Sequence, residues 1–422
     1  MADTNSTKKQ WILNGFTMST PGHLAPGLWR HPRNKSTKYN TLTYWTNLAQ
    51  ILERGKIHSF FIVDVLGPYD VYKGPHNFNP GLASASQIPM ADPFLAISAM
   101  AAVTSKLSFG ITASTTYENP YLLARRFGTL DALTNRRVAW NAVTRHLESA
   151  ARNVGLTTQI EHDERYSMAD EYLSLTKYFR SAGPLTTPPT RQRTPFIFQA
   201  GTSTAGKTFA TKHAGCMFLA GMDPATVRRS VDDIKSCAAA QRRDPNSIKT
   251  VAGIFIVVDE TDEKAQQKYE DYLSLDGDGS LYSQRRRRFP LYGAEGDTEP
   301  CFFVKQDCSW EWGLKWTKTR VAQEVALGGP HARAIGSAST VADILENWVE
   351  ESGVDGFNLS YAVAPAVFED IVTFLVPELQ RRGVFWTEYA AATTRENFLN
   401  DGLGPRLRDD HPGSVLKWAA ED

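Results

Sequence analysis

The chain has 422 residues, of which 42% are hydrophobic and 11% aromatic, which is enough apolar material for a large folded core. Lys and Arg together number 46, as do Asp and Glu, so the formal net charge is zero and gives no electrostatic support for binding nucleic acid or an anionic membrane. The four cysteines match no zinc-ligand spacing, so we expect no metal site. The first residues are polar, and no apolar run approaches transmembrane length, so we expect a cytoplasmic protein.

Short apolar runs recur along the chain and are expected to form strands. They cover Ile12–Phe16, Ile57–Asp64, Leu107–Thr112, Val138–Val143, Pro195–Gln199, Cys216–Leu219, Val251–Val258 and Gly356–Leu359. Apolar residues at helical spacing lie between most of them, as in Leu42–Arg54, Pro93–Thr104, Tyr121–Leu133, Met168–Phe179 and Val227–Ala240. This alternation predicts parallel βαβ units. Eight strands without a G-x-G-x-x-G fingerprint favour a closed (β/α)8 TIM barrel over an open Rossmann sheet.

Two segments interrupt the alternation. Residues 181–194 are rich in Pro, Thr and Ser and are typical of a surface loop. Residues 276–332 contain Gly and Asp turns, three tryptophans and the run Arg285–Arg288, and they are expected to form an insertion that acts as a lid or an oligomer contact. Because the surrounding charge is balanced, a solvated loop explains the Arg run better than a phosphate or nucleic-acid patch does. We expect one barrel domain over residues 1–422, with a C-terminal extension from about residue 384.

Polar residues follow several of the predicted strands, at the rim where βα-barrel enzymes build their active sites. The second strand ends in Asp64, which would either contact a ligand or simply cap the next helix. Hydroxyl groups are concentrated in Thr112–Tyr117, and Trp140–His146 follows the fourth strand. The small residues of Gln199–Gly206 lead into a helix, so their amides and the helix dipole could hold a phosphate, although a Ser or Thr cap there is also ordinary. Together these segments predict a phosphorylated cofactor without identifying it.

Several longer motifs carry a resemblance to a known family. They are Gly22-His23, Gly27–Pro32, Tyr44–Lys56, Tyr69–Tyr72, Gln87–Pro89, Ser114–Glu118, Trp140–Thr144, His162–Tyr166, Asp355–Leu359 and Val376–Gly383. On these motifs the chain resembles the bacterial luciferase-like flavin monooxygenases. The most similar branch contains the nitrilotriacetate, dibenzothiophene-sulfone, pristinamycin-synthase and long-chain alkane enzymes, and the alkane enzymes are the best match. The resemblance covers most of residues 11–270 and 335–395.

The resemblance implies a two-component monooxygenase in a luciferase-like barrel. Reduced FMN (FMNH2) would come from a separate NAD(P)H:FMN reductase and react with O2. A C4a-peroxyflavin would then insert one oxygen atom into an apolar or extended organic substrate, with a role in specialised metabolism. Members of the family are commonly dimers or tetramers, so a homo-oligomer is also implied.

The resemblance further implies a set of site residues. FMN would be surrounded by Asp64, Thr115, Arg145, His146, Tyr166, Ala200, Gly201, Thr202 and Ser203. The phosphate would lie near the hydroxyls of Tyr166, Thr202 and Ser203, and Asp64 would lie beneath the ring system. The candidate catalytic residues are His146, His23, Tyr69 and Gln87. A neutral His146 could donate a hydrogen bond to the reacting oxygen. For His146 and His23 the alternative is an ordinary loop histidine without a catalytic role. For Tyr69 and Gln87 the alternative is that the side chains only form part of the pocket wall.

The chain also departs from the family pattern. Thr20 stands where the alkane enzymes have a cysteine, and Arg145 replaces a small polar residue, where it would pair with the phosphate or crowd the site. The loop at residues 181–194 is shorter than usual, which predicts a wider entrance and less shielding from water, and residues 276–332 match the family poorly. A catalytically impaired FMN-binding protein is therefore the alternative function. The branch motifs disfavour a deazaflavin-dependent barrel.

Overall fold

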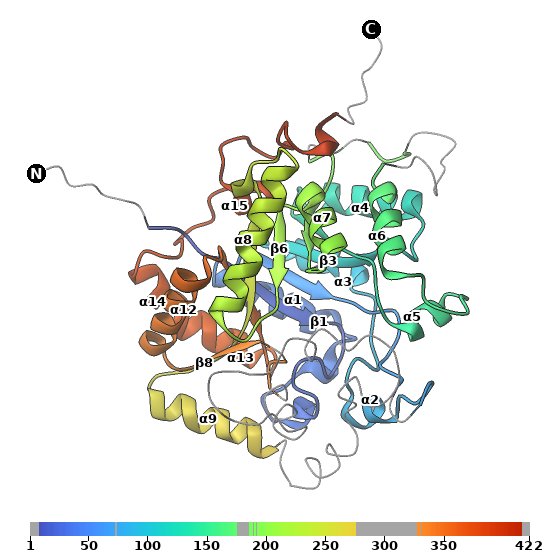
Figure 1. Ribbon diagram of the computed structural model, residues 1–422. Helices are drawn as coiled ribbons and strands as arrows, with labels where there is room; N and C mark the ends of the chain where they lie inside the picture. Colours follow the sequence, from blue (N-terminus) through green and yellow to red (C-terminus); the bar gives the residue numbers. More distant parts are fainter. Residues whose placement is uncertain are drawn as a thin grey trace, which may run out of the picture.

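A parallel sheet closes on itself into a barrel surrounded by helices (Figure 1). The computed structural model describes residues 8–71, 74–174, 185–188, 190, 192–275, 327–329 and 331–415. In these ranges eight strands form the closed barrel: β1 (Ile12–Met18), β2 (Ser59–Val63), β3 (Ser108–Ser114), β4 (Val138–Val143), β5 (Phe196–Gln199), β6 (Cys216–Leu219), β7 (Lys249–Asp259) and β9 (Gly356–Ser360). Each pairs in parallel with the next, and β9 returns to β1 with Ile12 opposite Gly356, which confirms the predicted (β/α)8 barrel.

One further strand, β8 (Ala332–Ser337), was not predicted. It pairs with the second half of β7 from Ile254 onward, whereas the first half of β7 pairs with β6 and β9. Its residues alternate between buried and half-buried, but the buried ones are Ala and Gly, so the apolar signal in the sequence is weak. The predicted insertion at residues 276–332 ends where β8 begins, and residues 276–326 and 330 lie outside the described residues.

The helices mostly confirm the predicted positions. They are α1 (Leu42–Arg54), α2 (Asn79–Ser84), α3 (Phe94–Ala102), α4 (Pro120–Leu133), α5 (Glu148–Asn153), α6 (His162–Tyr172), α7 (Thr204–His213), α8 (Pro224–Ala240), α9 (Asp262–Leu275), α12 (Ala338–Ser352), α13 (Ala366–Asp370), α14 (Val376–Arg381) and α15 (Thr394–Leu399). The predicted helix Met168–Phe179 in fact begins at His162, because the Glu161 side chain caps it by accepting from two backbone amides; residues 175–179 lie outside the described residues. Within the described part of the chain, no helix is long and apolar enough to cross a bilayer.

Aromatic side chains fill the barrel and close its N-terminal end. Inside, the Phe61 ring lies 5.0 Å from that of Phe198. At the end, Phe398 of α15 packs on Phe198 with ring centroids 5.3 Å apart, and Trp386 stacks on His58 at 3.8 Å. The segment from Phe385 to Phe398 therefore lies across the N-terminal end of the barrel. Because the N-terminal end is closed, a ligand-binding site is expected at the C-terminal rim of the barrel.

Burial of several histidines predicts that the fold loses stability in acid. Loss of hydration lowers the pKa of His58 and of His411 to about 3, and that of His331 to about 4. Below the ordinary pKa of 6.5 the unfolded chain therefore binds protons that the folded chain does not. The free energy of unfolding should accordingly fall as pH drops from about 6.5 towards 4, by about 1.4 kcal/mol per pH unit for each such histidine.

Urea titrations between about pH 7 and pH 4.5 measure this dependence. His58→Gln should remove about 1.4 kcal/mol per pH unit from the slope below pH 6. His76→Asn is the control, because His76 is exposed and its positive φ of 63° suits Asn. An identical slope in the wild type and in His58→Gln would contradict the prediction.

Candidate active site

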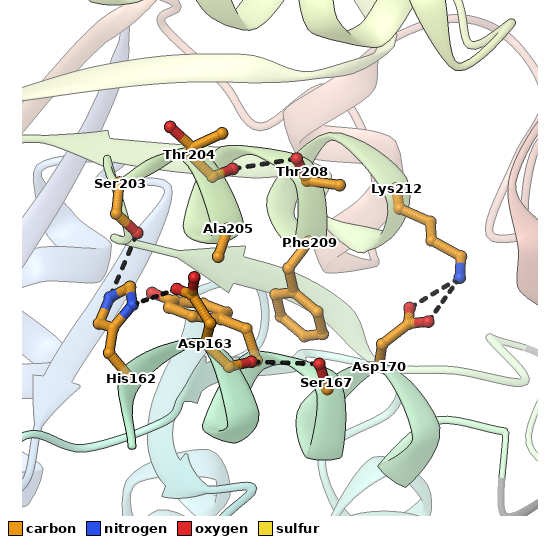
Figure 2. Close-up of a pocket in the computed structure, with 11 residues that line it drawn as sticks. His162, Asp163, Ser167, Asp170, Ser203, Thr204, Ala205, Thr208, Phe209 and Lys212 are labelled. Carbon is orange, nitrogen blue, oxygen red and sulfur yellow. Dashed lines mark hydrogen bonds and ion pairs between the residues drawn. The ribbon is translucent and has the colours of Figure 1, made fainter.

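A cavity of about 690 Å³ lies on the rim between α6 and α7, two helices that contact each other. Figure 2 shows Ser203 and His162 facing each other at one end of it, and Lys212 paired with Asp170 at the other. Its lining is His162, Asp163, Tyr166, Ser167, Asp170, Ser203, Thr204, Ala205, Thr208, Phe209 and Lys212. The cavity therefore lies beside the helix start that the sequence suggests for a phosphate.

The loop from Ala200 to Ser203 connects β5 to the N-terminus of α7. Ser203 is the N-cap residue, and its Oγ accepts from the backbone N–H of Gly206 at 3.1 Å. Nε2 of His162 lies 3.3 Å from the same Oγ. The backbone N–H of Gly201 donates to the Gln199 side chain, which orders the loop. A capped helix start with a histidine beside it favours a negatively charged group.

Tyr166 of α6 brings a hydroxyl group to this loop. A Cβ atom placed on Gly201 would lie only 2.2 Å from the Tyr166 Oη, and one on Gly206 would lie 2.9 Å from it. The hydroxyl thus lies directly against the loop backbone, where only glycine leaves room. The structure places the predicted phosphate residues Tyr166, Gly201 and Ser203 side by side, with Ala200 and Thr202 in the same loop.

A buried ion pair joins the ends of β2 and β4. Asp64 follows β2 and Arg145 follows β4, so the arginine side chain crosses the end of β3, which lies between them. Its Nη1 donates to the Asp64 carbonyl, and its Nη2 lies 3.2 Å from Asp64 Oδ2. The two side chains are 7% and 12% exposed. These hydrogen bonds place Arg145 with Asp64, whereas the sequence suggested that Arg145 would pair with the phosphate or crowd the site.

The environment of Asp64 disfavours the ionised form of its carboxyl group. Burial raises the pKa of Asp64 to about 6, although the Arg145 charge acts in the opposite direction and the nearby Asp92 adds to the rise. Burial also lowers the pKa of Arg145, but a guanidinium remains protonated near neutral pH. The pair is therefore a permanent cation beside a carboxylate whose ionised form the cation stabilises.

A second cavity, of about 350 Å³, lies beside Asp64. Gln87 lines it with a left-handed backbone (φ 58°), and its N–H donates to the carbonyl of Gly22 at 2.8 Å, which ties the loop after β2 to the loop after β1. Gln87 Oε1 is buried and has no hydrogen-bond partner among the described residues, so it is available to a ligand. The lining also includes Val65, Leu66, Gly67, Pro68, Ile88, Met90, Ala91, Asp92, Phe94, Thr112, Glu118 and Asn153.

Thr115 follows β3 and His146 follows β4, at the C-terminal rim of the barrel. Thr115 is buried, and both its N–H and its Oγ1 donate to the Val143 carbonyl, at 3.0 and 3.3 Å, so it supports the loop. The His146 residue is exposed. Enclosure by neighbouring atoms lowers the pKa of His146, as do the positive charges of Arg165 and Arg145. Because the residue is exposed to solvent, we infer that the two positive charges are the stronger cause of the lowered pKa. Its imidazole is therefore neutral near pH 7.

His23 lies on the loop after β1, inside the mouth of the barrel. Its ring lies 5.3 Å from that of Phe16 and 6.1 Å from that of Tyr361. Its Nδ1 is buried and has no hydrogen-bond partner among the described residues. Burial, and to a lesser extent the neighbouring His331, lower the pKa of His23 to about 3. This histidine is an uncharged group in an aromatic wall.

The prediction from sequence missed His331, which belongs to the same wall. Its Nδ1 lies 2.5 Å from Ser360 Oγ, and its ring packs against Phe16 and Phe218 at 5.9 and 5.7 Å. A Cβ atom on Gly253 of β7 would lie 2.3 Å from the His331 ring, so this glycine makes room for the imidazole. A glycine inside an otherwise apolar strand was the available signal of such a close approach.

The predicted residue Tyr69 is 37% exposed, and like His23 it lines neither of the two cavities. Among the described residues, no group of three or more His, Cys, Asp or Glu side chains could hold a metal ion. The candidate site therefore comprises two cavities, one at the start of α7 and one beside Asp64.

Comparisons with known proteins bear on the family of the chain. A family model described as luciferase-like monooxygenase matches residues 23–356. The dimethyl-sulfide monooxygenase of Hyphomicrobium sulfonivorans is 39% identical over 98% of this chain and 95% of its own. The long-chain alkane monooxygenase of Geobacillus thermodenitrificans (strain NG80-2) is 40% identical over 96% and 97%.

Two solved structures are also similar. The crystal structure of a long-chain alkane monooxygenase has a TM-score of 0.86 at 38% identity and covers 97% of this chain and 100% of that chain. The crystal structure of a riboflavin lyase with modified FMN and substrate riboflavin has a TM-score of 0.80 at 29% identity, with the same two coverages.

Proposed function

Because the chain belongs to the luciferase-like monooxygenase family, we propose that it is the oxygenase of a two-component system that uses reduced FMN and O2. A separate NAD(P)H:FMN reductase would supply the flavin, and the oxygenase would work as a homo-oligomer. The substrate would be an apolar or extended organic molecule that gains one oxygen atom. The second oxygen atom would leave as water, with the two electrons taken from reduced FMN.

The observation that carries the proposal is the meeting of Tyr166, Gly201 and Ser203 at the start of α7. A hydroxyl from α6, an N-cap serine and a glycine at which a Cβ atom would clash meet at the start of a helix, where a phosphate group is favoured. The similar structure of a riboflavin lyase with modified FMN supports FMN as the ligand. We expect the phosphate to contact Tyr166 Oη and Ser203 Oγ, with the ring directed along the rim towards Asp64.

Side chains of the protein would position the flavin, the oxygen and the substrate. Reduced FMN, when bound, supplies the electrons for activating O2. His146 would hold a hydrogen-bond donor at the reacting oxygen, because its imidazole is neutral and is exposed after β4 on the C-terminal rim. Gln87 would offer its unpartnered Oε1 to a polar group of the flavin or the substrate.

Product formation from isotopically labelled oxygen tests this function. The protein, a general flavin reductase, FMN and NADH would be incubated under ¹⁸O2 with a panel of substrates and analysed by mass spectrometry. The panel would begin with dialkyl sulfides and long-chain alkanes, because the relatives are named for such substrates, and continue with sulfones and heterocycles. We expect at least one product that carries a single ¹⁸O atom.

Matched reactions separate this function from its alternative. Label from H2¹⁸O should not enter the product, and omission of the reductase should abolish it. If FMN binds but only hydrogen peroxide forms across the panel, the catalytically impaired alternative is correct. If FMN does not bind, the cofactor assignment itself is wrong.

A further inference from the structure

Arg145 reaches a neighbour that the sequence did not suggest. It has a left-handed backbone (φ 57°), a conformation that residues other than glycine adopt infrequently. Its side chain crosses the end of β3 to reach Asp64. Its Nε is buried without a hydrogen-bond partner among the described residues. The guanidinium is therefore held at the Asp64 end of the site, by contacts with both the main chain and the side chain of that residue.

The other carboxylates near this end have partners of their own. Glu118, which lines the same cavity as Asp64, pairs with Arg126 at 3.0 Å. Asp92 accepts from the backbone N–H of Phe94 at 2.9 Å. Arg145 is thus the cation in direct contact with Asp64, and without it a buried carboxylate would lie uncompensated beside the cavity.

We propose that Arg145, acting through Asp64, makes the site prefer reduced FMN over oxidised FMN. This inference rests on the proposed function and adds a selectivity device to it. The ring of reduced FMN loses a proton near neutral pH and becomes an anion, whereas the oxidised ring is neutral and both forms carry the same phosphate. A difference in affinity between the two forms therefore reports on the ring end of the site.

The expected preference follows from the charges of Asp64 and Arg145 beneath the flavin ring. An ionised Asp64 alone would repel an anionic ring and leave the neutral ring largely unaffected. The Arg145 charge cancels that repulsion, and at a partly buried site a neighbouring unit charge can change affinity about tenfold or more. An enzyme that must receive its flavin already reduced, with the oxidised form leaving afterwards, would gain from such a preference.

The test measures the dissociation constants of oxidised FMN and of anaerobically reduced FMN by fluorescence titration. Four variants are compared with the wild type: Arg145→Gln, Arg145→Lys, Asp64→Asn and the double variant Asp64→Asn with Arg145→Gln. Arg145→Gln should weaken the binding of reduced FMN about tenfold more than that of oxidised FMN. Arg145→Lys should keep most of the preference, and the double variant should recover most of what Arg145→Gln loses.

The readout separates a charge effect from general damage. Arg125→Gln, at an exposed position on α4, is the control and should bind both forms like the wild type. If Arg145→Gln fails to fold, Asp64→Asn decides, because it leaves the Arg145 charge uncompensated and should increase the preference several-fold. Equal weakening of both forms in Arg145→Gln, or an unchanged preference in Asp64→Asn, would overturn the inference. A wild type that binds neither form would instead refute the proposed cofactor.

Discussion

Replacing His146 with alanine is expected to lower turnover by about 100-fold or more, while FMN affinity falls by less than about tenfold. We expect this loss because of where the His146 imidazole lies and because it is uncharged. The imidazole lies after β4 on the C-terminal rim, and partial loss of hydration together with the charges of Arg165 and Arg145 lowers its pKa and keeps it neutral. A neutral imidazole retains one N–H donor for the reacting oxygen. Single-turnover rates with a substrate found in the labelled-oxygen panel would measure the loss.

Two companion variants sharpen this test. His146→Gln keeps an N–H donor on a side chain of similar length and should recover part of the lost rate. His76→Asn replaces an exposed histidine outside both cavities and should behave like the wild type. A His146→Ala protein that keeps both flavin affinity and turnover would show that His146 is an ordinary loop histidine.

Replacing Gly201 with alanine is expected to weaken FMN binding by about 10- to 100-fold with little change in stability. The added Cβ atom would lie 2.2 Å from Tyr166 Oη and 2.9 Å from Gln199 Nε2, so both side chains must move. Movement of the tyrosine removes one hydrogen bond to the phosphate, and hydrogen bonds to charged groups contribute about 1.5–3 kcal/mol. Fluorescence titration with FMN measures the effect.

A double-mutant comparison identifies the cause. Tyr166→Phe removes the hydroxyl, so adding Gly201→Ala to that variant should weaken binding much less than adding it to the wild type. Gly81→Ala is the control glycine substitution, because its Cβ atom would have its nearest neighbour at 3.4 Å, an ordinary contact. If Gly201→Ala has the same effect in both backgrounds, the contact with Tyr166 does not hold the phosphate.

The barrel was largely predictable because its strands are buried on both faces and therefore appear as continuous apolar runs. The bounds of Val138–Val143 and Cys216–Leu219 agree at both ends with the observed strands. Strand β8 was missed because its buried positions hold Ala and Gly, which carry little apolar signal. The start of α6 was missed because the helix begins with charged residues, held by the Glu161 cap rather than by apolar spacing.

The site was predictable where residues act close to their own position in the chain. The loop at Gly201 and Ser203 directly precedes a helix, and Asp64 directly follows a strand, so local patterns indicate both. Long-range contacts were not accessible in this way. The direction of the Arg145 side chain depends on a left-handed backbone and on a partner two strands away. His331 enters the barrel mouth only because Gly253, distant in sequence, leaves space for its ring.

A crystal structure of the protein with bound FMN would test the assignment of the site most directly. We predict a phosphate within hydrogen-bonding distance of Tyr166 Oη and Ser203 Oγ, at the start of α7, with the flavin ring extending along the rim to the ion pair of Asp64 and Arg145. A phosphate bound away from the loop at residues 200–203, or a ring directed away from Asp64, would contradict it.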